Sequence, residues 1–328
     1  MHVLVVGGAG YIGSHTARAF LDAGYRVTVV DNLASGLREN LFPEASFIHG
    51  DILSHRSISE TFARAGAREP VEAVVHLAAF KAAGESMLEP EKYAENNISG
   101  TISLLNAAVA AGARHVVFSS SAAVYGEPKY LPVDEEHPTE PTNFYGHTKR
   151  AIEQLLSWYH ALRGLRSASL RYFNAAGYDP EGRVRGIELN PANLLPVIME
   201  VAAGSRESLT IFGEDYDTRD GTGIRDYVHV SDLARAHVQA LERIAGRDES
   251  VTVNLGSEEG ISVREMLETA RKITGREIPA EVGPRRAGDP ARLVASAAAA
   301  RELLGWEARY SDVESLVRTT WEVYRRQG

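Results

Sequence analysis

Short apolar runs alternate with helical patterns through the first 171 residues, and this alternation restricts the possible folds more than any other feature. The runs predicted as buried strands are Val3–Val6, Arg26–Asp31, Ser46–His49, Val71–Leu77, His115–Ser119 and Ser167–Arg171. The segments predicted as crossover helices are His15–Ala23, Ile58–Ala65, Glu91–Ala111 and Thr148–Leu162. This order predicts an α/β fold, a doubly wound parallel sheet with helices on both faces. Such sheets bind ligands beyond the carboxyl ends of their strands.

The pattern changes after Arg171. Glycine and proline recur between Asn174 and Pro196, which is typical of turns. Strands and helices then follow without strict alternation, over Leu209–Phe212, Ser231–Ala245, Val251–Leu255 and Val263–Thr274. We expect this half to form a smaller α/β domain that caps the ligand edge of the sheet, with some segments returning to the first domain.

The composition excludes several classes of protein. The 328 residues include no cysteine, so disulfides, thiolate metal sites, iron–sulfur clusters and cysteine nucleophiles are excluded, and no metal site is predicted. The formal net charge of −9 argues against binding nucleic acid or an anionic membrane. The first residues lack a basic segment followed by a long apolar stretch, so we expect a cytoplasmic protein.

A glycine cluster follows the first predicted strand and opens the first predicted helix. Gly7, Gly10 and Gly13 satisfy the spacing GxxGxxG, and Gly8 also fits GxGxxG. Glycines here let the backbone turn tightly and approach a pyrophosphate, whose charge then meets the N-terminus of the helix. Asp31 ends the second strand, where a carboxylate accepts from ribose hydroxyls and repels a 2′-phosphate. The cluster alone could be a tight turn, but with Asp31 it predicts a dinucleotide site that prefers NAD to NADP.

Two further strand ends fall at the same edge of the sheet. Asp51 and Ile52 follow the third predicted strand, and Leu77–Lys81 follows the fourth. Both points are expected to face the cofactor. Asp51 could bond the adenine amino group or could instead cap the next helix, and the sequence leaves both open.

Tyr145 and Lys149 are spaced i, i+4 at the start of a predicted helix, so their side chains share one face. An ammonium near a phenol favours the phenolate and lowers the pKa of the tyrosine from about 10 toward that of a general base. This spacing is often accidental, and the serine run Ser119–Ser121 supplies the context because it ends the fifth strand at the same edge. A serine hydroxyl there can share the substrate proton with the tyrosine.

Together these residues resemble the extended short-chain dehydrogenase/reductase superfamily and, within it, the UDP-glucose 4-epimerase (UDP-galactose 4-epimerase) family. The segments that carry the resemblance are GGAGYIGSH, DNL at 31–33, HLAAFKAAGES at 76–86, NNISGT at 96–101, FSSSAAVYG, YGHTK, RYFNAAG at 171–177, IFGEDYDTRDGTGIRDYVHV and RRAGDP at 285–290. They extend over nearly the whole chain. The glycine cluster and the Tyr/Lys pair mark only the superfamily, whereas HLAAFKAAGES and DGTGIRDYVHV are more specific.

The resemblance implies an NAD-binding Rossmann domain over 1–173, with returning segments around 225–256, and a UDP-sugar-binding domain over 174–328. The implied catalytic residues are Ser121, Tyr145 and Lys149. The implied NAD contacts are Gly7, Gly10, Tyr11, Ile12, Gly13, Asp31, Asn32, Asp51, Ile52, Phe80, Lys81, Asn96, Tyr145, Lys149 and Phe173. The implied UDP-sugar contacts are Ser121, Asn174, Asn193, Leu194, Thr210, Phe212, Arg225, Arg286 and Asp289.

The reaction that the resemblance implies is the reversible interconversion of UDP-glucose and UDP-galactose through a 4-ketopyranose. Tyr145 takes the proton of the 4-hydroxyl, Ser121 orients that hydroxyl, and C4 gives its hydride to a tightly bound NAD that is not consumed. The ketosugar then turns, and the hydride returns to its opposite face. Arg225 and Arg286 are expected to hold the diphosphate by charge-assisted hydrogen bonds. The resemblance also implies a homodimer packed through the helices near 91–111 and 148–162.

Two departures from related sequences bear on the reaction and its substrate. Ala122 and Ala123 stand where related sugar-nucleotide 4,6-dehydratases place Asp-Glu, so dehydration, which needs an acid and a base, is not expected. Leu293 stands where some family members have Tyr, and a smaller side chain there could admit a 2-acetamido group. Sibling 4-epimerases for UDP-N-acetylhexosamine, UDP-pentose or UDP-uronate are therefore alternatives. A third is an NAD(P)-sensing regulatory protein, which would need no Tyr/Lys pair.

Overall fold

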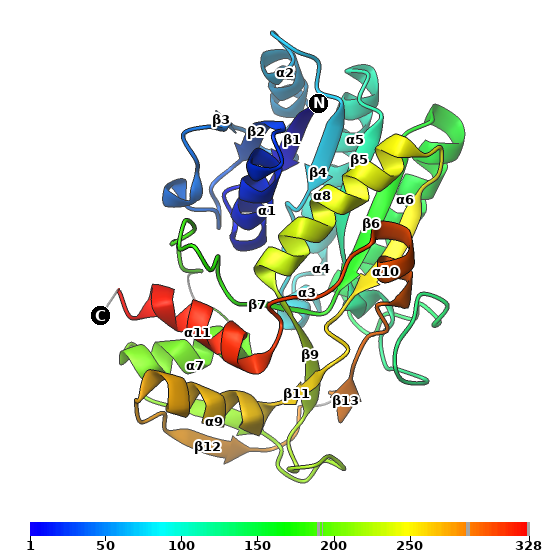
Figure 1. Ribbon diagram of the computed structural model, residues 1–328. Helices are drawn as coiled ribbons and strands as arrows, with labels where there is room; N and C mark the ends of the chain where they lie inside the picture. Colours follow the sequence, from blue (N-terminus) through cyan, green and yellow to red (C-terminus); the bar gives the residue numbers. More distant parts are fainter. Residues whose placement is uncertain (189–190, 192, 287–288, 327–328) are drawn as a thin grey trace.

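A seven-stranded parallel sheet forms the centre of the computed structural model, which describes residues 1–188, 191, 193–286 and 289–326 (Figure 1). The sheet order is β10-β6-β5-β4-β1-β2-β3. Its strands are β1 (His2–Val6), β2 (Arg26–Asp31), β3 (Ser46–His49), β4 (Ala73–His76), β5 (His115–Ser121), β6 (Arg166–Tyr172) and β10 (Val251–Leu255). All six strands predicted in the first half are present, and the predicted doubly wound α/β class is confirmed.

Helices cover both faces of this sheet, because the strands are apolar on both sides. One face carries α1 (Tyr11–Asp22) and α8 (Val230–Gly246); the other carries α2 (His55–Ala65), α5 (Gly100–Ala110) and α6 (Phe144–Arg163) (Figure 1). Successive side chains of β1 alternate between the two cores, as the period of a strand requires. Val3 and Val5 pack with Phe20 of α1, whereas Leu4 packs with Ile58 of α2.

The strand order places a ligand crevice beside β1. From β1 the chain winds outward through β2 and β3 on one side and through β4, β5 and β6 on the other. The loops after β1 and β4 therefore diverge, and the gap at such a switch point is where doubly wound sheets bind their ligands. The glycine cluster follows β1, and residues 77–81 follow β4.

The smaller half lies beyond the carboxyl ends of these strands (Figure 1). Its strands are β7 (Asn174–Ala176), β8 (Leu209–Phe212), β9 (Ile224–His229), β11 (Gly260–Ser262), β12 (Ala280–Gly283) and β13 (Arg292–Leu293). Strand β9 pairs with β7, β11 and β13, and β8 pairs with β12. The helices α7 (Leu194–Ala203), α9 (Val263–Thr274) and α11 (Val313–Tyr324) enclose a separate apolar core.

Three elements of the second half return to the large sheet. Strand β10 pairs in parallel with β6, α8 packs on α1, and α10 (Ala298–Leu304) packs on α8 and β10. The helix predicted over 91–111 is divided into α4 (Pro90–Tyr93), a π-helical turn (Ala94–Ser99) and α5, and it is preceded by the short α3 (Ala83–Ser86). None of the helices in the described ranges is long and apolar enough to cross a membrane.

Candidate active site

The glycine cluster forms the turn between β1 and α1. Gly7 has a φ of +82°, and a Cβ atom there would lie 2.7 Å from the backbone nitrogen of Ala78. A Cβ at Gly13 would lie 2.0 Å from the oxygen of Gly7, so close packing requires both glycines. Gly10 differs: its Cβ would meet only one described atom within 4 Å, the Gly7 oxygen at 3.4 Å. The space beside Gly10, at the N-cap of α1, therefore fits an anionic ligand such as a pyrophosphate.

Asp31 lies at the end of β2, and its carboxylate anchors the backbone on both sides. One oxygen accepts from the amide of Ala9 at 3.0 Å and the other from the amide of Leu33 at 2.8 Å. Asp31 is buried, with 8% of its surface exposed. Each carboxylate oxygen has a second lone pair for a ligand hydroxyl, which fits the predicted ribose contact.

Asn32 and Asp51 meet beyond the ends of β2 and β3. The Asn32 side chain donates to the Asp51 carboxylate at 3.0 Å, and the other Asp51 oxygen accepts from the amide of Leu53 at 2.9 Å. Ser54 rather than Asp51 caps α2, accepting from the amide of Ser57 at 3.2 Å. The alternative reading of Asp51 as the helix cap is therefore wrong, and its neighbour Ile52 is buried.

Asn97, in the π-helical turn, holds the loop after β4. Its side-chain oxygen accepts from the Phe80 amide at 2.9 Å, and its side-chain nitrogen donates to the Phe80 carbonyl at 3.0 Å. Asn96 donates to the same Asn97 oxygen at 2.9 Å, so the predicted contacts Phe80 and Asn96 lie together. Lys81 forms an ion pair with Glu188 at 2.5 Å. The sequence analysis missed Asn97, which is buried and stands beside Asn96 in the quoted NNISGT segment.

Ser121, Tyr145 and Lys149 come together at the carboxyl end of β5. Helix α6 is capped by Asn143, which accepts from the amide of Gly146 at 2.9 Å, so α6 begins directly before Tyr145. Ser121 accepts from the amide of Ala123 at 3.2 Å, and its hydroxyl is near enough to the Tyr145 phenol to lower the pKa of that phenol.

Lys149 is fully enclosed by this arrangement. Its Nζ donates to the Ser119 carbonyl at 2.7 Å and lies 5.7 Å from the centre of the Tyr145 ring. The three predicted catalytic side chains are thus neighbours.

Burial dominates the charge states of this group. It raises the pKa of Tyr145 to about 12, and the nearby Ser121 hydroxyl acts in the opposite direction. Burial lowers the pKa of Lys149 to about 7, and the negative charge of Glu153 opposes that shift. The Lys149 ammonium is bonded to a backbone oxygen rather than to the phenol. Its lowering of the tyrosine pKa therefore stays a prediction for the ligand-bound protein.

The predicted substrate residues form two close pairs in the smaller half. The guanidinium of Arg286 lies 3.9 Å from the centre of the Phe212 ring, a cation–π arrangement. Arg225 on β9 pairs with Asp289. Leu293 on β13 is in register with Arg225 and packs, like Phe173, against the apolar cluster that includes Ala122 and Val124 just after Ser121. These contacts connect the strand end of Ser121 with the arginine side of the smaller half.

The remaining predicted substrate residues are more dispersed. Asn174 donates to the Asp226 carbonyl at 2.9 Å, and Thr210 lies on the exposed side of β8 with Phe212. Asn193 occupies the N-cap of α7 without a side-chain capping bond, and Leu194 packs on the apolar core of the smaller half. Tyr11 and Ile12 begin α1; the Tyr11 hydroxyl donates to the Gly177 carbonyl, joining the glycine turn to the segment after β7.

Comparison with known proteins connects this geometry to one family. The sequence model of the NAD dependent epimerase/dehydratase family matches residues 3–256. The chain belongs to this family. The resemblance inferred from its motifs is thereby confirmed over residues 3–256.

Relatives of this epimerase/dehydratase cover almost all of it. The UDP-glucose 4-epimerase of Lacticaseibacillus casei is 47% identical over 321 residues, which are 98% of this chain and 96% of that protein. The crystal structure of UDP-glucose 4-epimerase from Brucella ovis in complex with NAD is 43% identical, with a TM-score of 0.95 over 99% of this chain and 98% of that one. The UDP-glucose-4-epimerase of Stenotrophomonas maltophila, with bound NAD and formylated UDP-arabinopyranose, is 40% identical, with a TM-score of 0.94 over 100% and 98%.

Proposed function

We propose that this epimerase/dehydratase interconverts UDP-glucose and UDP-galactose by oxidation and re-reduction at C4 of the sugar, with a retained NAD. The observation that carries the proposal is the meeting of Ser121, Tyr145 and Lys149 at the end of β5, on the same sheet edge as the glycine turn. The relatives called UDP-glucose 4-epimerase, which span nearly the whole chain, support the choice of substrate.

The residues that would hold the cofactor follow the first four strands. When bound, NAD supplies the hydride acceptor for C4 and returns the hydride. The turn at Gly10 and the N-terminus of α1 hold the pyrophosphate, and Asp31 accepts from the adenosine ribose. Asn32 and Asp51 would contact the cofactor beyond β2 and β3, and Phe80, Lys81 and Asn96 would contact it beyond β4. The carboxylate of Asp31 also disfavours a 2′-phosphate.

Proton transfer belongs to the side chains at the end of β5. Tyr145 accepts the proton of the 4-hydroxyl, and Ser121, whose hydroxyl lies near the Tyr145 phenol, orients that hydroxyl. Lys149 lies within 5.7 Å of the tyrosine ring and favours the phenolate through its charge. Because burial holds the pKa of Tyr145 near 12, positive charge must arrive next to it before it can act as a base near neutral pH.

The smaller half holds the nucleotide while the sugar turns. Arg225 and Arg286 contact the diphosphate, Phe212 packs on the uracil, and the Asp289 carboxylate accepts from the ribose. Two arginines, one of them fixed by a carboxylate, favour a dianionic group over a neutral one. Binding energy from this remote nucleotide positions the hexose without holding it, so either face of C4 can meet the hydride.

Product analysis without added cofactor tests the proposal. Purified protein is incubated with UDP-glucose or UDP-galactose, and the nucleotide sugars are separated by chromatography. Both substrates are expected to converge on the same mixture. The co-purified NAD is expected to be reduced transiently, which is seen as a rise in the near-ultraviolet absorbance of NADH. An empty cofactor site, or bound NAD(P) with no turnover, would instead support the regulatory-sensor alternative. The presence of Ser121, Tyr145 and Lys149 together counts against that alternative.

A sibling specificity is supported by one contact. Leu293 lies in register with Arg225 and packs with Phe173 beside the strand end of Ser121, so its size bears on the space near the sugar. A leucine leaves more room there than a tyrosine, which favours acceptance of a UDP-N-acetylhexosamine in addition to UDP-hexoses. The Stenotrophomonas structure holds a UDP-pentose derivative, so a second sugar class is compatible with this family.

We further propose that the active form is a homodimer built on α5 and α6. Trp158 and Leu162 are one turn apart on α6 and are 65% and 67% exposed, and Ile102 on α5 is 36% exposed. Large apolar side chains on adjacent helices are typical of an interface between subunits.

A further inference from the structure

Glu153 extends the catalytic stripe of α6 by one turn. Tyr145, Lys149 and Glu153 are spaced by four residues each, so their side chains lie along one face of the helix, against the sheet. Lys149 and Glu153 are almost completely enclosed, with the Glu153 side chain 11% exposed. A buried carboxylate destabilises the folded protein unless it is paired and hydrogen-bonded, so the partners of Glu153 are informative.

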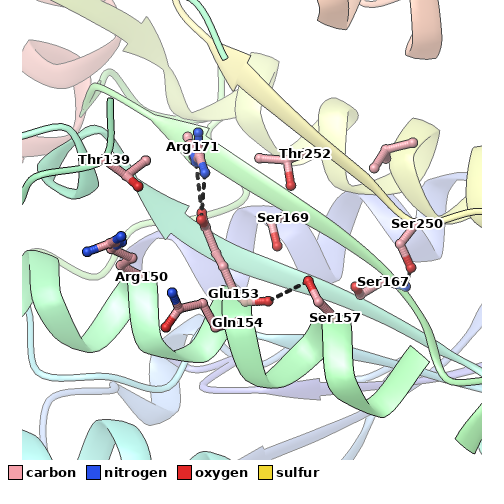
Figure 2. A pocket seen from close by; sticks show the side chains of 11 residues that line it. Thr139, Arg150, Glu153, Gln154, Ser157, Ser167, Ser169, Arg171, Ser250 and Thr252 are labelled. Carbon is pink, nitrogen blue, oxygen red and sulfur yellow. Dashed lines mark hydrogen bonds and ion pairs between the residues drawn. The ribbon is translucent and has the colours of Figure 1, made fainter. Parts of the chain in front are cut away.

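The Glu153 carboxylate is fixed from the sheet by two strands. One of its oxygens accepts from the Ser120 hydroxyl on β5 at 2.6 Å. Arg171 on β6 donates to both oxygens, at 2.9 Å and 2.7 Å, in a bidentate pair (Figure 2). Ser120 and Arg171 are direct neighbours in the β5–β6 register, and the next pair in that register is Ser121 with Tyr172. The Glu153 carboxylate therefore connects α6 to β5 and β6 directly before Ser121.

Arg171 is itself fixed by a further hydrogen bond, so the position of the Glu153 carboxylate is well defined. It donates to the Tyr125 hydroxyl at 3.0 Å, and that hydroxyl donates to the side chain of Asn254 on β10 at 2.6 Å. The Glu153–Arg171 pair borders a polar pocket of about 310 Å³ that is lined by α6, β6 and β10 (Figure 2). None of the predicted cofactor or substrate residues lines this pocket. The pair therefore lines this pocket and also contacts Ser120, the residue before Ser121 on β5.

We propose that Glu153 is a positioning residue for the proposed reaction, holding the Lys149 ammonium charged and the Ser121 strand end in place. This role rests on the functions proposed for Ser121, Tyr145 and Lys149. Glu153 is paired with Arg171 of β6, and the titratable groups near Lys149 also include His76 on β4, whose pKa burial lowers to about 3, and Tyr145 on the same helix. Neither supplies a negative charge at neutral pH in the absence of ligand, whereas Glu153 opposes the lowering of the Lys149 pKa by burial.

Competitive labelling of the five lysines tests this inference directly. Trace acetic anhydride is added to NAD-loaded protein across a pH series, and mass spectrometry quantifies acetylation at Lys149, with Lys81, Lys92, Lys129 and Lys272 as internal references. In Glu153→Gln we expect the labelling midpoint of Lys149 to fall by about one pH unit, because an opposite charge nearby shifts a pKa by about that much or more. The reference lysines keep their midpoints, and Glu153→Asp restores most of the Lys149 midpoint.

Two further variants keep the test decisive. Glu153→Gln leaves Arg171 buried without its partner and can fail to fold, so the double variant Glu153→Gln/Arg171→Met removes the pair together. It is expected to show a smaller fall in the same direction, because the positive charge of Arg171 is lost as well. Glu60 is an exposed residue on α2 that pairs with Arg56 at 2.7 Å, and Glu60→Gln is the matched control. It should leave the midpoint of Lys149 unchanged. A Lys149 midpoint in folded Glu153→Gln equal to that of the unsubstituted protein, or a midpoint in the double variant above it, overturns the inference.

The pH dependence of turnover separates this inference from the proposed function. With the charge of Glu153 removed, kcat falls more at pH 8.5 than at pH 6.5, while KM for the UDP-sugar stays within about twofold because Glu153 does not touch the substrate. A merely structural role would lower kcat by the same factor at both pH values, and that result overturns the inference. If the labelling midpoint falls but kcat keeps its pH profile, Glu153 controls the charge of Lys149 and the catalytic role of Lys149 itself is wrong.

Discussion

The Nζ atom of Lys149 donates to the carbonyl oxygen of Ser119 at 2.7 Å, two residues before Ser121, whose hydroxyl lies near the Tyr145 phenol. The lysine therefore has two consequences: it ties α6 to the end of β5, and it places a positive charge near a phenol that burial keeps protonated. The same burial that makes this charge effective also makes it costly to the folded protein.

Replacing Lys149 by methionine separates these two effects. Turnover is expected to fall by a factor of about 10² or more, since the phenolate loses its positive neighbour. The free energy of unfolding of Lys149→Met, in contrast, is expected to exceed that of the unsubstituted protein below pH 7. The pKa of Lys149 is lowered from its ordinary value of 10.5 to about 7, so the unfolded chain binds more protons between those values.

The sign of the stability effect follows from that difference. The cost of burying the Lys149 ammonium is complete below pH 7 and is relieved as the pH rises toward 10.5. The unfolding free energy of the unsubstituted protein should therefore rise with pH across this window, by at most about 1.4 kcal/mol per pH unit, relative to Lys149→Met. Urea unfolding at pH 7, 8 and 9 measures the difference; parallel curves for the two proteins would contradict it.

Alanine at two glycines distinguishes folding from cofactor binding. Gly13→Ala places a Cβ atom 2.0 Å from the Gly7 oxygen, so we expect a large loss of stability, seen as a fall in melting temperature. Gly10→Ala meets only that oxygen, at 3.4 Å, and its φ of −75° suits alanine, so the fold is expected to persist. The methyl group then occupies the pyrophosphate space, and the purified Gly10→Ala protein should carry little NAD. A Gly10→Ala protein with full NAD content would place the cofactor elsewhere.

Leu293→Tyr tests the sugar specificity. The added ring and hydroxyl fill space beside Phe173 and the strand end of Ser121, so turnover of UDP-N-acetylglucosamine is expected to fall by at least about tenfold. Turnover of UDP-glucose should change much less, because it has no acetamido group to accommodate. Leu293→Met, which nearly conserves volume, serves as the control. Equal and negligible rates with UDP-N-acetylglucosamine in the unsubstituted protein and Leu293→Tyr would remove the idea.

Charge on the outer face of α6 tests the dimer. Trp158→Glu and Leu162→Glu place carboxylates at the most exposed apolar positions of α6, and burying them against a second copy would be costly. Sedimentation velocity should show a dimer for the unsubstituted protein and a monomer for the double variant. Val282→Glu, on β12 and 53% exposed, should leave the dimer intact. A monomeric unsubstituted protein would contradict the proposed interface.

Local patterns were sufficient for much of the fold. Strands β2 and β3 and helix α9 have the predicted bounds, because apolar alternation and flanking turns act over a few residues. The partner of Val251–Leu255 was beyond such reasoning, since pairing with β6 depends on contacts about eighty residues apart. The π-helical turn was also missed. It contains Asn97, which is hydrogen-bonded to Phe80 seventeen residues earlier, and such a contact is not visible in a local pattern.

The candidate site shows the same division. The i, i+4 spacing correctly predicts that Tyr145 and Lys149 lie together. It does not reveal that Lys149 is buried, that it bonds Ser119, or that Glu153 one turn further on is tied to Ser120 and to Arg171 of another strand. Burial and cross-strand contacts decide charge states, and both emerge only when the sheet is assembled.

Tyr145→Phe provides the most direct test of the central claim, that a tyrosine phenolate beside a retained NAD moves the proton of the 4-hydroxyl. The variant keeps the ring and loses only the hydroxyl, so folding and NAD content should match those of the unsubstituted protein. Chromatography of UDP-galactose incubated with each protein, without added cofactor, should show conversion to UDP-glucose slowed by a factor of about 10² or more in the variant. Conversion at an undiminished rate by Tyr145→Phe would contradict the account.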